Sequence, residues 1–194
     1  MANRSFVYTA NSYSQGPIEA VGLSEYNYEV HPLYLLLVAF NTEIIFSNVI
    51  EEEEKTAVIG DFEKGKNLVF NFLELILTYD KSFHSDSFET FVAVSKEVLG
   101  QRKQKYVTLE SFEIIQSSED NFVAGMVQEL EGIKNQIEEM YAKHLRGDLV
   151  EKDIYETSFY NDFEDVCTQY GQIEIEEIDW FDFWTDTLYY DLKA

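Results

Sequence analysis

Cysteine is almost absent from this chain: Cys167 is the only one among 194 residues. A single cysteine excludes an intramolecular disulfide and is typical of proteins that fold in a reducing compartment. The N-terminal stretch Met-Ala-Asn-Arg-Ser-Phe also lacks the basic region and apolar core of a secretory signal. We therefore expect a cytoplasmic protein.

Long hydrophobic runs are absent as well. The longest uninterrupted run covers residues 33–40 and has eight members. A bilayer-spanning helix needs about 20 residues, so the sequence predicts no membrane segment.

Basic side chains are also scarce. The chain has 14 Lys and Arg against 37 Asp and Glu, which gives a net charge of −23. Because nucleic acid and anionic lipid are negative too, this charge excludes non-specific binding to either of them. Two interpretations are left. The charge either serves only to keep the protein soluble, or it attracts and binds a basic partner.

Motifs for covalent and phosphate chemistry are missing. No Gly-x-Ser-x-Gly segment marks a nucleophilic serine. Cys167 follows Asp165, and neighbouring acid would raise the thiol pKa, so we expect a packed, unreactive side chain. Residues 60–66 place two glycines and a lysine as a phosphate-binding loop does, yet Asn67 stands where the magnesium-binding Ser or Thr belongs. The spacing therefore supports no phosphate site.

Metal ligands do not cluster in the sequence either. The three histidines are far apart: His31, His84 and His144. Asp179, Asp182 and Asp186 would share one face of a helix, but Trp180 interrupts them and no glycine provides the turn of a calcium loop. No pair of carboxylates is singled out for glycoside hydrolysis. We expect no cofactor and no metal, and we favour a protein that is not an enzyme.

Apolar residues are plentiful enough for a core, since hydrophobic residues make up 45% of the chain and aromatic residues 15%. Folding at this length buries roughly 70% of the chain's surface, so we expect one domain over residues 1–194. The spacing of apolar residues predicts strands at 4–9, 56–59, 106–115 and 187–192, and helices at 33–40, 61–79, 86–100, 121–144 and 155–170. Residues 11–22 and 51–54 are predicted loops, and 42–50 is ambiguous. The pattern indicates an α+β fold with several helices packed on a small, mostly antiparallel sheet.

Several residues predict where helices begin and end. Asp61 is expected to cap the helix over 61–79, and Asp86, with Glu89 three residues later, is expected to cap the next one. Gly100 is the expected end of that second helix, and Gly147 with Asp148 is expected to break the chain between the long helix over 121–144 and the acidic segment.

The acidic charge is concentrated at the C-terminal end. Residues 149–194 hold thirteen acidic and two basic residues, a net of −11, together with both tryptophans. Averaged over roughly 9,500 Å² of surface, the chain has about 400 Å² per net charge against about 100 Å² for DNA, and the C-terminal quarter reaches about half the DNA density. Acid mixed with large aromatic anchors favours a folded binding surface. We predict partner contacts at these residues: Glu174, Glu176, Glu177, Asp179, Trp180, Asp182, Trp184 and Asp186.

Three hypotheses about function stay open. The leading one is a non-enzymatic protein-binding protein, of the kind that serves as an immunity protein and occludes a basic partner such as a toxin or a nuclease. The second is an enzyme or small-ligand binder whose carboxylate site has no recognisable motif. The third is a purely structural or scaffold subunit of an acidic complex.

Short segments near the start of the chain resemble a family of uncharacterised bacterial proteins whose members begin Met-Ala-Asn-Arg-Ser followed by aromatic residues. The segments are Met-Ala-Asn-Arg-Ser-Phe-Val-Tyr at 1–8, Gly-Leu-Ser-Glu-Tyr-Asn at 22–27 and Gly-Asp-Phe-Glu-Lys-Gly at 60–65. The resemblance implies a bacterial, cytosolic origin and no particular activity. It draws attention to Ser24, Glu25 and Asn27 either as a shared polar site or as part of an ordered loop.

Overall fold

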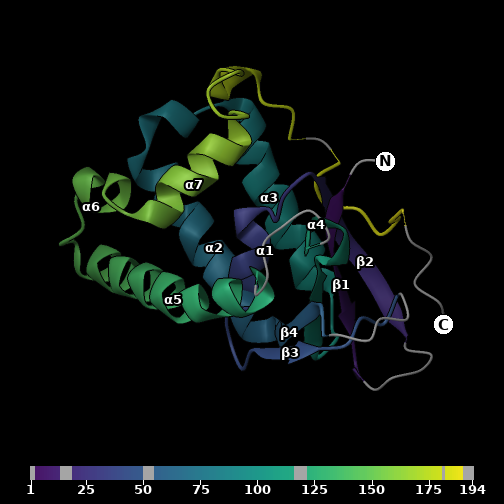
Figure 1. Ribbon diagram of the computed structural model, residues 1–194. Helices are drawn as coiled ribbons and strands as arrows, with labels where there is room; N and C mark the ends of the chain where they lie inside the picture. Colours follow the sequence, from purple (N-terminus) through teal and green to yellow (C-terminus); the bar gives the residue numbers. More distant parts are fainter. Residues whose placement is uncertain (1–2, 14–18, 50–54, 116–121, 181, 190–194) are drawn as a thin grey trace.

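The computed structural model describes residues 3–13, 19–49, 55–115, 122–180 and 182–189. They form one α+β domain, as predicted, in which helices pack against a five-stranded sheet (Figure 1). Within these residues, no helix has the length and apolarity needed to cross a membrane. The predicted acidic loop at 51–54 lies outside the described residues.

All strand pairings in the sheet are antiparallel. The strands are β1 (Arg4–Ala10), β2 (Ala20–Asn27), β3 (Glu43–Ile45), β4 (Ala57–Asp61) and β5 (Tyr106–Glu110), in the spatial order β2-β1-β5-β4-β3. Because β1 and β5 lie inside the sheet, nearly all their residues are buried.

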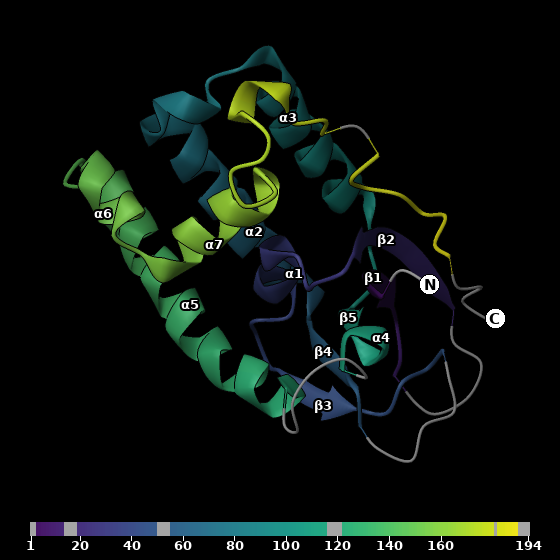
Figure 2. The same ribbon diagram turned by 45° about the horizontal axis from the view of Figure 1, so that its top comes forward.

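The helical layer includes α1 (Pro32–Leu37), α2 (Phe62–Tyr79), α3 (Asp86–Gln101), α4 (Phe112–Ile115), α5 (Phe122–Arg146), α6 (Glu151–Tyr155) and α7 (Ser158–Cys167). Two short 3-10 turns follow α2 and α7, namely η1 (Lys81–Phe83) and η2 (Ile175–Glu177). Helix α2 is central, since it contacts α1, α3, α5 and α6 (Figures 1 and 2).

The sheet has a different apolar core on each face. Alternate residues of a strand point to opposite faces, so Val7, Val58 and Leu109 join the main core beneath the helices. Phe6 joins a smaller cluster on the other face, where its ring meets Phe112 of α4 edge-on with 6.0 Å between ring centroids. Burial on both faces explains why apolar residues occupy adjacent positions in these strands, as Phe6 and Val7 do in β1.

Capping side chains begin the two long helices next to the sheet. Asp61 is confirmed as the cap of α2, because its Oδ1 accepts a hydrogen bond from Lys64 N at 3.1 Å. The cap of α3 is Ser85, whose Oγ accepts from Phe88 N at 3.2 Å. The predicted cap at Asp86 is therefore one residue too late, and Asp86 lies in the first helical turn.

The predicted helix ends are partly confirmed. Gly147 has a positive φ of 76° and follows the last residue of α5, as expected for a glycine that ends a helix. Gly100 is not a stop, because α3 continues through it to Gln101. The helix predicted over 33–40 begins at Pro32 and already ends at Leu37.

Several strand predictions need correction. The predicted loop over 11–22 contains the start of β2, where Ala20 pairs with Ala10 and extends the hairpin with β1. The ambiguous stretch 42–50 contains the short strand β3. The strand predicted over 106–115 ends at Glu110 and is followed by α4.

The C-terminal third also differs from prediction. The single helix predicted over 155–170 is interrupted because Thr157 caps α7, its Oγ1 accepting from Tyr160 N at 3.3 Å. The predicted closing strand over 187–192 is wrong for residues 187–189, which are not in a strand, and the remaining residues lie outside the described part.

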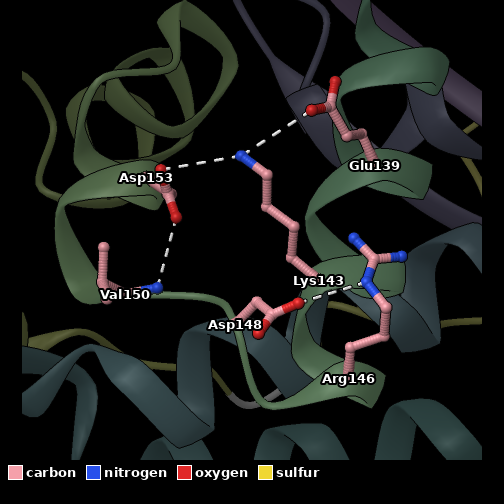
Figure 3. A network of polar contacts seen from close by, with 6 residues as sticks. All are labelled: Glu139, Lys143, Arg146, Asp148, Val150 and Asp153. Atoms are coloured by element: carbon pink, nitrogen blue, oxygen red, sulfur yellow. Dashed lines mark hydrogen bonds and ion pairs between the residues drawn. The ribbon is translucent and has the colours of Figure 1, made fainter.

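A polar network joins α5 to α6, where the acidic C-terminal segment begins (Figure 3). Lys143 Nζ lies 3.7 Å from carboxylate oxygens of both Glu139 and Asp153. Asp153 Oδ2 also accepts from the backbone N–H of Val150 at 3.2 Å. Exposed ion pairs of this kind contribute about 0–1 kcal/mol each, so the network mainly orients α6.

Candidate functional site

A groove lies between the first half of α3 and the segment that follows η2. Its volume is about 400 Å³, and it is lined by Asp86, Ser87, Thr90, Phe91, Val94, Trp180, Asp182, Phe183 and Trp184. In both ribbon views the C-terminal segment passes α3 on its way to β2 (Figures 1 and 2).

Aromatic rings form the floor and one wall of the groove. Phe91 stacks on Trp180 with 4.5 Å between ring centroids, and Phe183 stands perpendicular to Phe91 at 5.4 Å. Trp184 is in turn perpendicular to Phe183 at 4.8 Å. The Trp184 indole N–H donates to Ser95 Oγ at 2.7 Å, which fixes the orientation of the half-buried ring. The apolar surface is therefore preformed.

Residues of β2 and α1 hold this segment in place. Ser24 Oγ donates to the carbonyl oxygen of Phe183 and accepts from the Tyr34 hydroxyl, the latter at 2.7 Å. Thr185 N donates to Leu23 O at 2.8 Å along the outer edge of the sheet. A strand edge left open invites pairing with other chains, and here the C-terminal segment covers part of that edge.

The anchoring continues beyond the groove. Glu25 accepts from Tyr189 N at 2.7 Å, and the Arg4 guanidinium lies 4.1 Å from the centre of the Tyr189 ring. Gly22 allows the segment to approach β2 closely, because a Cβ there would lie 2.7 Å from Asp186 O. Any other residue at this position would push the segment away.

These contacts give a structural role to part of the motif noted at 22–27. Ser24 and Glu25 each bind the C-terminal segment, whereas Asn27 lies at the end of β2 opposite Arg4. Two of the three polar residues therefore act as anchors of the groove-forming segment.

The predicted partner-binding residues lie in two places. Trp180, Asp182 and Trp184 line the groove. The others lie along the segment on either side of it: Glu174, Glu176, Glu177, Asp179 and Asp186. All six acidic members are exposed, while Trp180 is 8% exposed and packs into the core. The carboxylates of this segment therefore point toward solvent, and its tryptophan rings point toward the protein.

One expectation about this segment is wrong. Asp179, Asp182 and Asp186 do not share a helical face, because the described residues between 179 and 186 form a turn, bends and irregular backbone, with Asp182 at a φ of 62°. In the described part of the chain, no group of three or more His, Cys, Asp or Glu side chains is placed to hold a metal ion.

Sequence reasoning missed the α3 side of the groove. The sequence predicts a helix over 86–100 with its cap at Asp86, and neither prediction indicates a binding site. Val94 lines this side of the groove as an apolar residue that is 41% exposed, and only the structure shows that exposure.

A second hollow of about 440 Å³ lies at the opposite end of the molecule, near β3 and the start of α5. Its lining is Ile44, Lys55, Thr56, Ile115, Phe122, Val123 and Ala124. Among the residues that the structure describes, its lining contains none of the predicted site residues and no acidic side chain.

The remaining ionisable groups of interest are buried. Cys167 is a packed thiol, as expected, but burial raises its pKa more than the nearby Glu164 does. His31 is also buried, and its Nδ1 accepts from Leu33 N at 3.2 Å. Burial lowers the pKa of His31 to about 3, so this side chain is neutral at physiological pH.

Glu110 is a fully buried carboxylate on the α4 side of the sheet. Its Oε1 accepts from the Tyr8 hydroxyl at 2.9 Å and from Asn48 N at 3.2 Å. Burial raises the pKa of Glu110 to about 6, and hydrogen bonds from Asn48, Ser47 and Tyr8 oppose the shift. Neither hollow is lined by Glu110, so we treat it as a structural group.

The raised pKa of Glu110 predicts a pH-dependent effect of Glu110→Gln. A group whose pKa is about 6 folded and 4.5 unfolded stabilises the fold below pH 4.5, and this contribution is lost as the pH rises through 6. The glutamine variant should therefore gain about 2 kcal/mol relative to the wild type between about pH 4 and pH 7. Urea unfolding of both proteins across this range measures the difference.

His31 titrates in both proteins and cancels in that comparison. The contribution of His31 to stability changes with pH in the opposite direction to that of Glu110. Its lowered pKa gives stability above pH 6.5 that is lost as the pH falls toward 3. The exposed Glu138→Gln is the matched control, because it makes the same substitution at the surface. A Glu110→Gln variant whose gain over the wild type does not change with pH would contradict the assignment.

Comparisons with known proteins concern mainly the region up to α5. The family model described as a domain of unknown function, DUF7822, matches residues 10–147. No curated protein and no solved structure matches the chain. The match contains the α3 side of the groove, and the aromatic segment 180–184 lies outside it. Since the match covers more than half of the sequence, the chain belongs to this domain family of unknown function.

Proposed function

We propose that this chain is a non-enzymatic binding protein that uses its acidic C-terminal segment to occlude a basic protein partner, as an immunity protein does with a toxin or nuclease in a bacterial cell. The observation that carries the proposal is that the acidic and the tryptophan side chains of residues 174–186 face different ways. Their six carboxylates are exposed, whereas Trp180 and Trp184 turn toward α3.

Physical reasons favour binding over catalysis. Charge of one sign on a defined surface steers an oppositely charged partner and speeds its association. An interface also needs apolar anchors that are fully desolvated in the complex, and the aromatic groove offers such surface beside the acids. The two most deeply buried carboxylates, Asp80 and Glu110, are engaged in internal hydrogen bonds.

Affinity capture with two charge-matched variants tests the proposal. The first neutralises the acids beside the groove and leaves the groove intact: Glu174→Gln, Glu176→Gln, Glu177→Gln and Asp186→Asn. The second neutralises four exposed acids of α5: Glu129→Gln, Glu131→Gln, Glu138→Gln and Glu139→Gln. Both raise the net charge by the same amount, so a general charge effect would appear in both.

We expect the wild type and the α5 variant to capture one basic protein from the bacterium that encodes the chain. The complex should weaken at least about tenfold when salt rises from about 0.1 M to about 0.5 M, because screening removes the long-range attraction. The variant with neutral acids beside the groove should lose the partner. Equal loss in both variants, or a partner that is not basic, would contradict the proposal.

A further inference from the structure

We propose that the groove between α3 and residues 180–184 binds one arginine side chain, presented by the basic partner. This inference rests on the proposed function and names the chemical group that the groove recognises. It is carried by the aromatic lining, by two exposed carboxylates at the rim and by the size of the hollow.

The groove has the dimensions of a single-group site. Small-molecule pockets measure about 300–1,000 Å³, and this groove, at about 400 Å³, lies near the lower limit. It is open on one side, because Asp86, Thr90 and Val94 on its lining are exposed. A long side chain can therefore enter from a neighbouring protein surface while its backbone stays outside.

The wall favours a flat cation. The Trp184 ring is half-buried, so part of its surface is accessible, and the bond to Ser95 holds it in place. Tryptophan gives the strongest cation–π attraction among side chains. A guanidinium is planar and weakly hydrated, so it stacks on such a ring at a lower desolvation cost than an ammonium does. Exposed Val94 provides apolar surface for the methylene stem.

The rim supplies the opposite charge. Asp86 and Asp182 lie on the lining and are exposed, and within the described residues neither takes part in an ion pair. Asp86 lies in the first turn of α3, where the helix dipole contributes about half a positive charge and offsets part of its attraction for a cation. Asp182 is in a turn without such an offset, so we assign it as the main carboxylate partner.

Intrinsic fluorescence can test this inference without a label, because the only two tryptophans of the chain both line the groove. The probes are three short peptides of otherwise uncharged residues that differ only at one central position, which is arginine, lysine or citrulline. Citrulline keeps the shape of arginine and removes its charge. Titrating each peptide into the full-length protein gives an affinity from the change in tryptophan emission.

We expect saturable binding of the arginine peptide and at least about tenfold weaker binding of the lysine and citrulline peptides. Asp182→Asn should weaken arginine binding about tenfold, and the control Glu138→Gln on α5 should leave it unchanged. Trp184→Phe should retain more affinity than Trp184→Leu, because only phenylalanine keeps a ring for the cation. Circular dichroism of each variant separates loss of binding from loss of the fold.

Three results would overturn the inference. Equal binding of citrulline would show an apolar site, equal binding of lysine would show a site for any cation, and no saturable binding would show no site. None of them bears on the capture experiment, whose variants leave the groove intact. If the basic partner is captured as expected and the peptides fail, the inference is wrong and the proposed function stands. If the arginine peptide binds and no basic partner is captured, the proposed function is wrong and the groove is still an arginine site.

Discussion

Replacing Gly65 by alanine is expected to destabilise the protein by about 3 kcal/mol. A Cβ on this residue of α2 would lie 1.9 Å from Leu37 O and 2.6 Å from Leu37 C, both backbone atoms of α1. Backbone cannot move aside as a flexible side chain can, so the two helices would have to separate. Since α2 contacts four other helices, that separation would disturb the main core.

The expected sign is opposite to that given by helix propensity. Glycine-to-alanine exchange inside a helix normally stabilises it by about 1 kcal/mol. Gly132 of α5 is the matched control, because it is exposed and a Cβ there would meet nothing within 4 Å. Gly132→Ala should therefore stabilise the protein by about 0.5–1 kcal/mol. Urea unfolding followed by circular dichroism measures both, and a Gly65→Ala variant as stable as the wild type would refute the close helix contact.

Removing the carboxylate of Asp80 is expected to cost about 3–4 kcal/mol of unfolding free energy. Asp80 is 1% exposed and joins the end of α2 to η1, α6 and α7. Its Oδ1 accepts from Ser82 N at 2.9 Å and from the Tyr155 hydroxyl at 3.2 Å, and its Oδ2 accepts from the Tyr160 hydroxyl. In Asp80→Ala these three donors lose their acceptor, and the Tyr160 hydroxyl loses it inside the core.

A graded series distinguishes this network from a general loss of packing. Tyr160→Phe removes one buried donor and should cost about 1.5 kcal/mol. Tyr155→Phe should cost less, because the Tyr155 hydroxyl also donates to Glu151 at 2.8 Å near the surface. The predicted order of destabilisation is Asp80→Ala, then Tyr160→Phe, then Tyr155→Phe, measured by urea unfolding at neutral pH. An Asp80→Ala variant that loses less than a single tyrosine variant would contradict it.

Local sequence signals predicted most elements next to the main core. The Asp61 cap and the apolar face that follows it determine α2, because both signals arise within a few residues of one another. Gly147 likewise predicted the break in the chain after α5. By contrast, β2 was not predicted, because residues 20–27 are held as a strand by pairing with β1, a contact between separate segments.

The two glycines at 60 and 65 show how spacing alone can suggest the wrong explanation. In the sequence they resemble part of a phosphate-binding loop. In the structure a Cβ on Gly60 would lie 2.7 Å from Val38 Cα, and Gly65 lies against Leu37 in the same way. Both glycines therefore allow the end of α1 to pack closely on β4 and α2, and nothing local to either residue indicates this.

The sequence by itself determined the excess of acid, its concentration after residue 149 and the presence of aromatic residues among those acids. Composition and periodicity are properties of the chain, so they need no fold to be known. Only the tertiary structure decided that Trp180 and Trp184 turn toward α3 while the six carboxylates stay in solvent. That arrangement depends on contacts of Ser24 and Glu25 with residues more than 150 positions away. Long-range contacts of this kind form only when the sheet and helices have brought the two ends of the chain together.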